Sequence, residues 1–301
     1  MKLSIIIVSF NTKELLKDCL MSLVTHYQSQ FTQNQFEIIV VDNASNDGTQ
    51  SEIKKRFQGV CLIENRKNLG FAKANNLGVK ESKGEIVLFL NPDTKVPENT
   101  LSVMTEYLKV NPKVGIATCK VVLADGSIDD ASHRGFPTPW RAMTHFIGLS
   151  RLFPRSQLFN GYHLGYQNMD TIHEIDSCVG AFLMIKRSVG DKLRWFDEDY
   201  FWYGDDLDLC YRAKQAGYQV TYVPTVSITH YKGAASGLKK HSEHLSYADN
   251  ETKRLATRSR FEVMRIFYHK HYLHLYPKWL TGLVFLGISL KQKFTELGRI
   301  H

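Results

Sequence analysis

The sequence predicts an α/β protein with a doubly wound, mostly parallel sheet and a basic, helical C-terminal tail. Short apolar runs rich in β-branched residues indicate strands that are buried on both faces. These runs alternate with segments of helical period, the order that builds a parallel sheet with right-handed crossovers. The net charge of +8 is concentrated at the end of the chain, because residues 239–301 carry 12 Lys/Arg against 5 Asp/Glu, a net +7.

The first 123 residues supply most of the expected sheet. Leu3–Ser9 is the first strand, and Thr12 is the expected N-cap of a helix whose apolar residues recur at the helical period. The run Ile86–Leu90 is expected to form a central strand that ends at Asn91-Pro92-Asp93, because proline cannot donate to a strand pairing. Further strands are expected at 36–41, 60–63 and 114–123, with helices up to about residue 80 and from 97 to about 109.

The pattern is less regular after Leu123. The pair Asp125-Gly126 predicts a tight hairpin turn. Residues 132–172 mix Gly, Pro and aromatic residues without a period, which is typical of a long functional loop or of small inserted elements. Regular structure is expected again at 175–186, followed by a helix from about 205 to 216 that ends at Gly217. Two more strands are expected at 219–223 and 226–230.

The tail is helical in pattern. Apolar residues recur every three to four positions over 261–275, and Pro277 is expected to end that helix. Trp279–Leu290 is apolar for only twelve residues, whereas a bilayer span needs about 20. This piece is therefore expected to lie in a membrane interface or to pack internally. The basic charge favours an anionic partner, and the aromatic and apolar segments favour a membrane surface over nucleic acid.

The sequence argues against a cysteine-based zinc site and against a signal peptide. The five cysteines are odd in number and scattered without a CxxC pair. This pattern favours reduced thiols in a cytosolic protein and argues against a cysteine-based zinc site. The first apolar run passes directly into Asn11 and polar sequence, so no signal peptide is expected.

Polar residues follow four of the expected strands. Because open α/β sheets bind ligands at the carboxyl ends of their strands, the segments 9–11, 42–43, 65–71 and 91–93 are expected to converge on one site. The chain has neither GxGxxG after the first strand nor GxxxxGK[ST], so the usual glycine cradles for phosphate are absent. A diphosphate would need another counter-charge, which a metal ion held by Asp93 would provide.

An ordered set of segments resembles the family 2 glycosyltransferases, in particular the rhamnosyltransferase-type members. These segments are SFN, VDNASNDGT, NLGFAKANNLG, LNPDT, GAFLMIKR, FDEDYFWYGDDLDLCYR and HYKG, and together they cover about residues 3–235. The resemblance implies a GT-A fold over 1–238, with a donor half at about 1–123 and an acceptor half at about 124–238. It also implies a nucleotide-sugar donor, such as a UDP- or dTDP-sugar, and inversion in a single displacement.

The resemblance also assigns roles to the matching positions. Asp42 would bind the nucleotide base, and Asp93 would bind Mn²⁺ or Mg²⁺ with His230 as an additional ligand. Asp206 would be the catalytic base, with Asp205 beside it where Glu is commoner. The other donor-site candidates are Ser9, Asn11, Asn43, Asn68, Gly70, Phe71, Asn75 and Asn91, the last replacing the first carboxylate of the metal-binding element. The acceptor-site candidates are Gly180, Trp202 and Tyr203.

Structural roles for these residues stay open. Asp42, Asp47 and Asp205 could end a strand or cap a helix, where a carboxylate gains about 0.3–1 kcal/mol from the helix dipole. Adjacent carboxylates point about 100° apart on a helix, so one can cap while the other faces the cleft. His230 could be a satisfied polar residue, and the 201–203 aromatics could belong to the core or stack on an acceptor sugar.

We therefore expect an inverting, metal-dependent transferase that moves one sugar, rhamnose or a hexose, to a lipid-linked or surface-glycan acceptor. It would act in the cytoplasm, peripherally at the inner face of the cell membrane. The QxxRW of processive members is absent, since the only Arg-Trp, at 194–195, precedes the acidic pair. One alternative is a sugar nucleotidyltransferase, although its glycine- and basic-rich loop is missing. The other is a catalytically impaired glycan-binding protein, which Asn91 favours.

Overall fold

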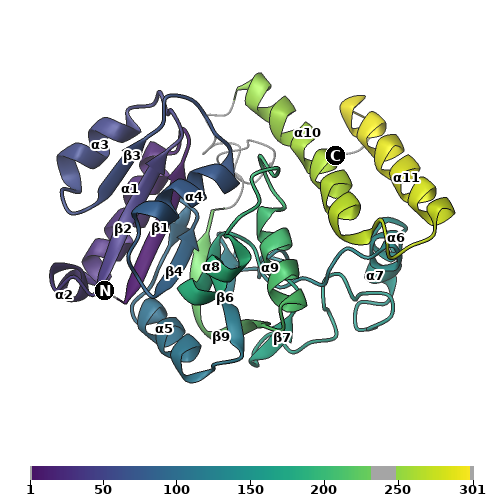
Figure 1. The fold of residues 1–301 in the computed structure, drawn as a ribbon, viewed down its shortest axis with the longest axis horizontal. Coiled ribbons are helices and arrows are strands. Elements are labelled where there is room, and N and C mark those ends of the chain that lie inside the picture. The colour runs from purple at the N-terminus through teal and green to yellow at the C-terminus, as the bar shows by residue number, and fades with distance from the viewer. Residues whose placement is uncertain (1, 232–248, 299–301) are drawn as a thin grey trace.

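The computed structural model describes residues 2–231 and 249–298, and its centre is a single sheet. Within these residues the sheet has nine strands in the order β3-β2-β1-β4-β8-β6-β9-β5, and β7 pairs with β9 beside that path. Helices cover both faces, and two long C-terminal helices stand side by side at one end of the molecule (Figure 1). The predicted α/β class is confirmed.

The first half of the sheet is parallel, as predicted. Its strands are β1 (Leu3–Ser9), β2 (Phe36–Asp42), β3 (Cys61–Glu64) and β4 (Ile86–Leu90). Side chains alternate along each strand, so Ile5 and Ile7 of β1 enter one core cluster while Ile6 and Val8 enter the other. Because β1, β2 and β4 are buried on both faces, they are mostly apolar runs in the sequence, whereas β3 at the edge is partly exposed.

Helices link these strands: α1 (Lys13–His26), α2 (Gln28–Thr32), α3 (Thr49–Arg56) and α4 (Phe71–Glu81). Thr12 does occupy the N-cap position of α1, but its hydroxyl makes no capping bond and pairs instead with the Ser9 hydroxyl at 3.0 Å. The Asp47 carboxylate accepts from the Lys13 N–H (2.9 Å) and so satisfies this helix start from another segment.

The second half of the sheet is mixed. Its strands are β5 (Thr94–Lys95), β6 (Val114–Leu123), β7 (His173–Ile175), β8 (Phe182–Lys186) and β9 (Gln219–His230). β8 lies antiparallel between β4 and β6, whereas β6 and β9 are parallel. The two strands expected at 219–230 form one strand with a register shift opposite Cys119/Lys120. The helices here are α5 (Thr100–Val110), α8 (Arg187–Leu193) and α9 (Asp205–Gln215).

The segment 132–172 contains small inserted elements, one of its two expected forms. They are α6 (Pro139–Phe146) and α7 (Leu149–Leu152). The hydroxyl of Thr138 caps α6 by accepting from the Arg141 N–H. The expected turn before this segment is also present, with Gly126 at φ +85° and a bridge between Val122 and Ile128.

The tail forms α10 (Asn250–Phe267), a π-helical turn η2 (Tyr268–Tyr272) and α11 (Lys278–Glu296). Pro277 precedes α11, so the expected helix break is confirmed. Phe267, Tyr268 and Tyr272 are buried in a cluster with Tyr200 of the preceding domain. The predicted domain boundary at 238/239 lies outside the described residues. Among the described helices, none combines the length and apolar character needed to cross a bilayer.

Candidate active site

Asp42 lies at the end of β2, on the edge where β1, β2 and β4 terminate. Its side chain is fully buried. One carboxylate oxygen, Oδ2, accepts from the Ser45 N–H (3.0 Å) and from the Gln50 amide (2.7 Å), while Oδ1 has no hydrogen-bond partner among the described residues. Buried polar atoms are rarely left unpaired without a reason. Oδ1 is thus the acceptor of this carboxylate that the described residues leave unused, and its contact with a nucleobase stays a prediction.

Several predicted donor-site residues form hydrogen bonds that connect the strand ends at this edge of the sheet. The Asn43 amide donates to the Gly70 carbonyl (3.1 Å) and accepts from the Asn65 amide (2.8 Å). Ser9 is buried against Thr12, and Asn75 donates to the Phe71 carbonyl (3.0 Å). These side chains hold the strand ends and the 65–71 loop in place, and their direct contact with a donor stays a prediction.

The 68–71 loop is tied to the loop that precedes α9. The Phe71 N–H donates to the Phe201 carbonyl (2.8 Å), and a Cβ at Gly70 would lie 2.6 Å from that carbonyl oxygen. Gly70 also has φ +83°, a conformation that glycine adopts without strain. Asn68 accepts from the Gly70 N–H (2.9 Å), and Asn11, at φ +52°, accepts from the Asn46 N–H (2.9 Å). Glycine at position 70 thus permits this close approach of the two loops.

Asp93 and His230 meet at the predicted metal position. His230 Nε2 lies 3.2 Å from Asp93 Oδ1 and 3.4 Å from the Asn91 amide nitrogen, and Nδ1 lies 3.2 Å from Asp129 Oδ2. Burial alone would lower the pKa of His230, but the charges of Asp93 and Asp129 outweigh it and raise the pKa to about 9. No motif in the sequence marked Asp129, which lies just after the 125–126 turn.

The chemistry of this donor set fits a hard divalent cation. A carboxylate oxygen and an imidazole nitrogen lie together, and a second carboxylate holds the far nitrogen of the imidazole, as is common behind metal-bound histidines. Within residues 2–231 and 249–298 no group of three His, Cys, Asp or Glu has metal-binding geometry. A cation here would therefore need further ligands, such as donor phosphate oxygens and water.

The acidic pair opens α9, and its two carboxyl groups have different surroundings. Asp206 Oδ2 accepts from the Gly180 N–H (3.1 Å) and lies 3.8 Å from the Arg134 guanidinium. Asp205 Oδ2 is buried with no hydrogen-bond partner among the described residues. Burial, reinforced by the Asp206 charge, raises the pKa of Asp205 well above its usual range. Asp205 is thus the carboxyl that favours the protonated form.

Gly180 and Ala181, which directly precede β8, connect the predicted metal position to the acidic pair. The Asn91 N–H donates to the Ala181 carbonyl (3.3 Å), and the neighbouring Gly180 donates to Asp206. A Cβ at Gly180 would lie 3.2 Å from the Phe71 ring. The structure therefore brings together candidates from the donor, acceptor and catalytic sets.

The predicted acceptor aromatics lie beside the tail. Trp202 and Tyr203 are half-buried, with ring centroids 6.2 Å apart. Trp202 lines a small cavity together with Glu262 and Val263 of α10. These aromatics are therefore not part of the closed core, and stacking on an acceptor sugar stays a prediction.

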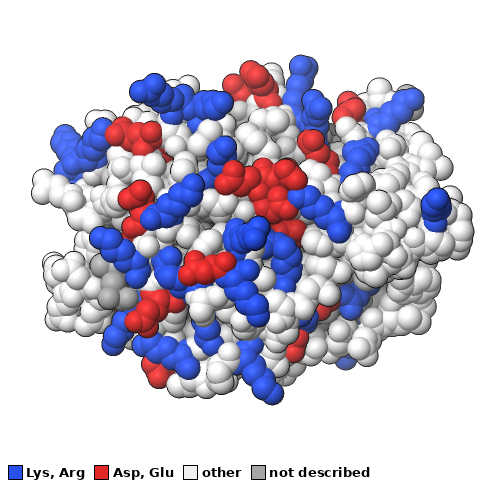
Figure 2. Space-filling view, in the orientation of Figure 1, with Lys and Arg blue, Asp and Glu red and all other residues white. Residues whose placement is uncertain are grey.

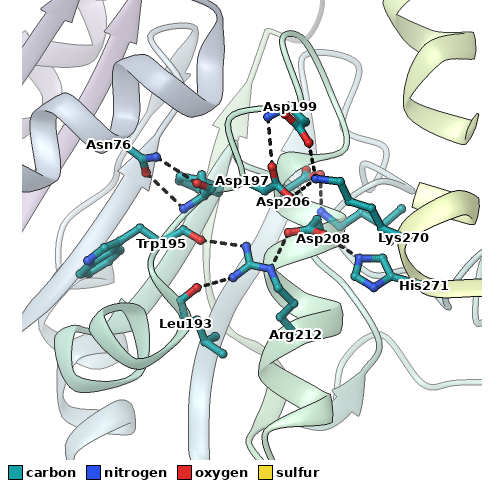
Figure 3. A network of polar contacts seen from close by, with 12 residues as sticks. Asn76, Leu193, Trp195, Asp197, Asp199, Asp206, Asp208, Arg212, Lys270 and His271 are labelled. Carbon is teal, nitrogen blue, oxygen red and sulfur yellow. Dashed lines mark hydrogen bonds and ion pairs between the residues drawn. The ribbon is translucent and has the colours of Figure 1, made fainter. Parts of the chain in front are cut away.

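A polar network connects the tail to α9 and to the loop before it (Figure 3). The fully buried Asp208 carboxylate contacts the Arg212 guanidinium (2.6 Å) and the His271 imidazole (2.7 Å). Lys270 pairs with Asp197 and with Asp199 (2.6 Å) in the loop before α9. Sequence reasoning missed this network. The one available signal was that positions 205 and 208 are three apart and share a helix face.

We expect Asp208→Ala to lower the free energy of unfolding by about 1–3 kcal/mol, because it removes the fully buried carboxylate that the Arg212 guanidinium and the His271 imidazole contact. Urea unfolding at neutral pH measures this loss. Asp18→Ala is the matched control, since Asp18 is about half exposed and its pair with Lys95 (3.6 Å) lies on the surface. The control should cost about 0–1 kcal/mol. Equal losses in the two variants would show that the network does not stabilise the junction.

The comparisons with known proteins agree with this geometry. The fold matches the mannosyltransferase PcManGT from Pyrobaculum calidifontis, solved with GDP-Man and Mn²⁺, with a TM-score of 0.55 and 17% identity over 98% of this chain and 87% of that one. The fold is thus that of the GT-A glycosyltransferases. The chain belongs to glycosyl transferase family 2, whose family model matches residues 4–189.

Two curated relatives are rhamnosyltransferases. The N-acetylglucosaminyl-diphospho-decaprenol L-rhamnosyltransferase of Mycobacterium tuberculosis is 26% identical over 227 residues, which cover 71% of this chain and 72% of that protein. The rhamnosyltransferase WbbL of Escherichia coli K12 is 27% identical over 236 residues, covering 75% of this chain and 82% of that one. The resemblance inferred from the sequence motifs is confirmed.

Proposed function

We propose that this glycosyltransferase is inverting and metal-dependent, and that it moves one rhamnose or hexose from a UDP- or dTDP-sugar to a lipid-linked or surface-glycan acceptor. The observation that carries the proposal is the position of Asp206, fixed by Gly180 next to the strand end that bears Asn91 and Asp93. The names of the two relatives support rhamnose as the sugar, and one of them names a diphospho-decaprenol acceptor.

The described residues divide the chemistry between them. Asp42 Oδ1 accepts from the nucleobase and fixes the donor. Mn²⁺ or Mg²⁺, held by Asp93 and His230, would neutralise charge on the departing diphosphate. Asp206 takes the proton of the acceptor hydroxyl as its oxygen attacks the anomeric carbon from the face opposite the diphosphate, which inverts that carbon. Arg134 places a positive charge 3.8 Å from the Asp206 carboxylate.

The proposed location is the cytoplasm, peripheral at the inner face of the cell membrane, where a lipid-linked acceptor is presented. The net +7 of residues 239–301 supports an anionic surface as partner. Asn91 replaces a carboxylate in the metal-binding element. This replacement favours one alternative, a glycan-binding protein with impaired catalysis.

Thermal unfolding with a panel of nucleotide-sugars, with and without Mn²⁺, tests the donor assignment. One UDP- or dTDP-sugar should raise the midpoint in Mn²⁺, since a ligand at about 100 times its Kd stabilises by about 2.7 kcal/mol. Asp42→Ala should lose most of this response, while Asp18→Ala, on the surface of α1, should keep it. A chain that no nucleotide-sugar stabilises would contradict the proposal.

A further inference from the structure

α11 carries an apolar stripe on its outer side. Its large apolar residues are three to four positions apart, so they share one face of the helix. They are 42–69% exposed, whereas Thr281 and Ile288 are the buried residues of this helix. The stripe consists of Trp279, Leu283, Leu286, Leu290, Phe294 and, at the C-cap, Leu297. Arg265 of α10 donates to Ser289 of α11 (3.2 Å), which places the two helices against each other.

The segment 139–158 exposes a second apolar set next to this stripe. Its members are also 42–69% exposed: Trp140, Met143, Phe146, Ile147, Leu152, Phe153 and Leu158. The Lys291 ammonium of α11 lies 3.6 Å from the centroid of the Phe146 ring, so segments more than a hundred residues apart are neighbours in space (Figure 1). We call the α11 stripe and the exposed residues of 139–158 together the docking surface.

The chain around the docking surface is basic and nearly free of acidic residues, with Glu296 beside Leu297 as the exception on α11. Residues 131–169 contain four arginines and no Asp or Glu, and residues 263–295 contain five Lys/Arg and no Asp or Glu. Three of these nine, Arg134, Arg141 and Lys270, pair with acids of the domain. The other six form no ion pair among the described residues: Arg151, Arg155, Arg265, Lys278, Lys291 and Lys293. In Figure 2 the end of the molecule occupied by α11 and α6 is largely uncharged, with scattered basic residues and an acidic group near the end of α11.

We infer that the docking surface lies in the headgroup region of an anionic lipid layer. Exposed apolar residues flanked by Lys and Arg, on a helix that does not span, are the features of an interfacial element, and each segment exposes a tryptophan suited to that depth. A second copy of the chain is a poorer occupant, because a two-fold contact through this surface would bring like charges together. The inference rests on the proposed function in one respect, since it explains how a lipid-linked acceptor is reached.

Sedimentation of the full chain with phosphatidylcholine vesicles, with and without phosphatidylglycerol, tests the inference. Binding should require the anionic lipid and weaken with salt. Leu283→Glu/Leu290→Glu should weaken binding by about tenfold or more, because it places charges in the apolar layer. Phe146→Glu should weaken it too, and Lys293→Gln by about fivefold, which corresponds to about 1 kcal/mol per basic residue. Val110→Glu, at an exposed position of α5, is the control and should bind as the wild type does.

Several results would overturn the inference. The inference fails if the wild-type protein does not sediment with anionic vesicles. It also fails if Leu283→Glu/Leu290→Glu binds them as well as the wild type does. If Phe146→Glu binds vesicles as the wild type does, the 139–158 segment is not part of the docking surface. A dimer that Leu283→Glu/Leu290→Glu dissociates, without vesicle binding, would make a second copy the occupant. The assay contains neither donor nor acceptor, so a failure of sugar transfer leaves its result intact. Transfer to a short, water-soluble acceptor should be unchanged in the double variant.

Discussion

Asp206→Asn is expected to lower the turnover number by about 10²–10⁴-fold, the usual contribution of a positioned general base. Asparagine keeps the shape of the side chain and can still accept from the Gly180 N–H, but it cannot take a proton from the acceptor hydroxyl. Donor affinity should barely change, because the proposed donor contacts lie at Asp42 and Asp93. Turnover measured beside donor affinity therefore separates loss of the base from loss of binding.

Asp205→Asn is the matched control on the neighbouring residue. The Asp205 carboxyl is buried, and burial raises its pKa well above the usual range, so a neutral amide resembles the form that the site favours. The loss of turnover should be much smaller than for Asp206→Asn. An inactive Asp205→Asn beside a mildly affected Asp206→Asn would place the base on Asp205. Equal loss of donor binding in both would assign the pair to the donor site or to the fold.

Asp93→Ala is expected to abolish transfer, and a chelator should do the same to the wild type. Asp93 is the carboxylate nearest to His230 Nε2 at the strand end, and no glycine cradle is available to bind the diphosphate in its place. Mn²⁺ affinity, measured by electron paramagnetic resonance without donor, should fall sharply in this variant and stay unchanged in Asp18→Ala. Full activity of the wild type in excess chelator would contradict the metal role.

The strand ends were predictable because their signals are local. Continuous apolar runs marked β1, β2 and β4, and the polar residues that follow them, Asp42 and Asp93 among them, lie where parallel strands end. Pairings between distant segments were not predictable. Gly180 reaches Asp206 only because β8 inserts antiparallel beside β4, and Asp129 pairs with His230 across 101 positions.

In the tail, too, local features were predictable and contacts between distant segments were not. Its helices and the break at Pro277 followed from the helical period, but the period could not tell which apolar face is covered. Phe267 and Tyr272 pack against Tyr211 of α9, and His271 contacts Asp208 of the same helix. A chain cut after residue 254 would therefore lose this packing as well as any membrane contact, so point variants on α11 are the sharper test.

The central claim is that the strand-end site transfers one sugar from a nucleotide-sugar. The most direct measurement combines the full chain, Mn²⁺, the donor that stabilises it most and a lipid-linked diphospho-sugar, and analyses the product by mass spectrometry and NMR. The account predicts that the acceptor gains one sugar, that one nucleoside diphosphate is released per transfer, and that the new anomeric configuration is opposite to that of the donor. A donor that binds but is neither transferred nor hydrolysed would contradict it.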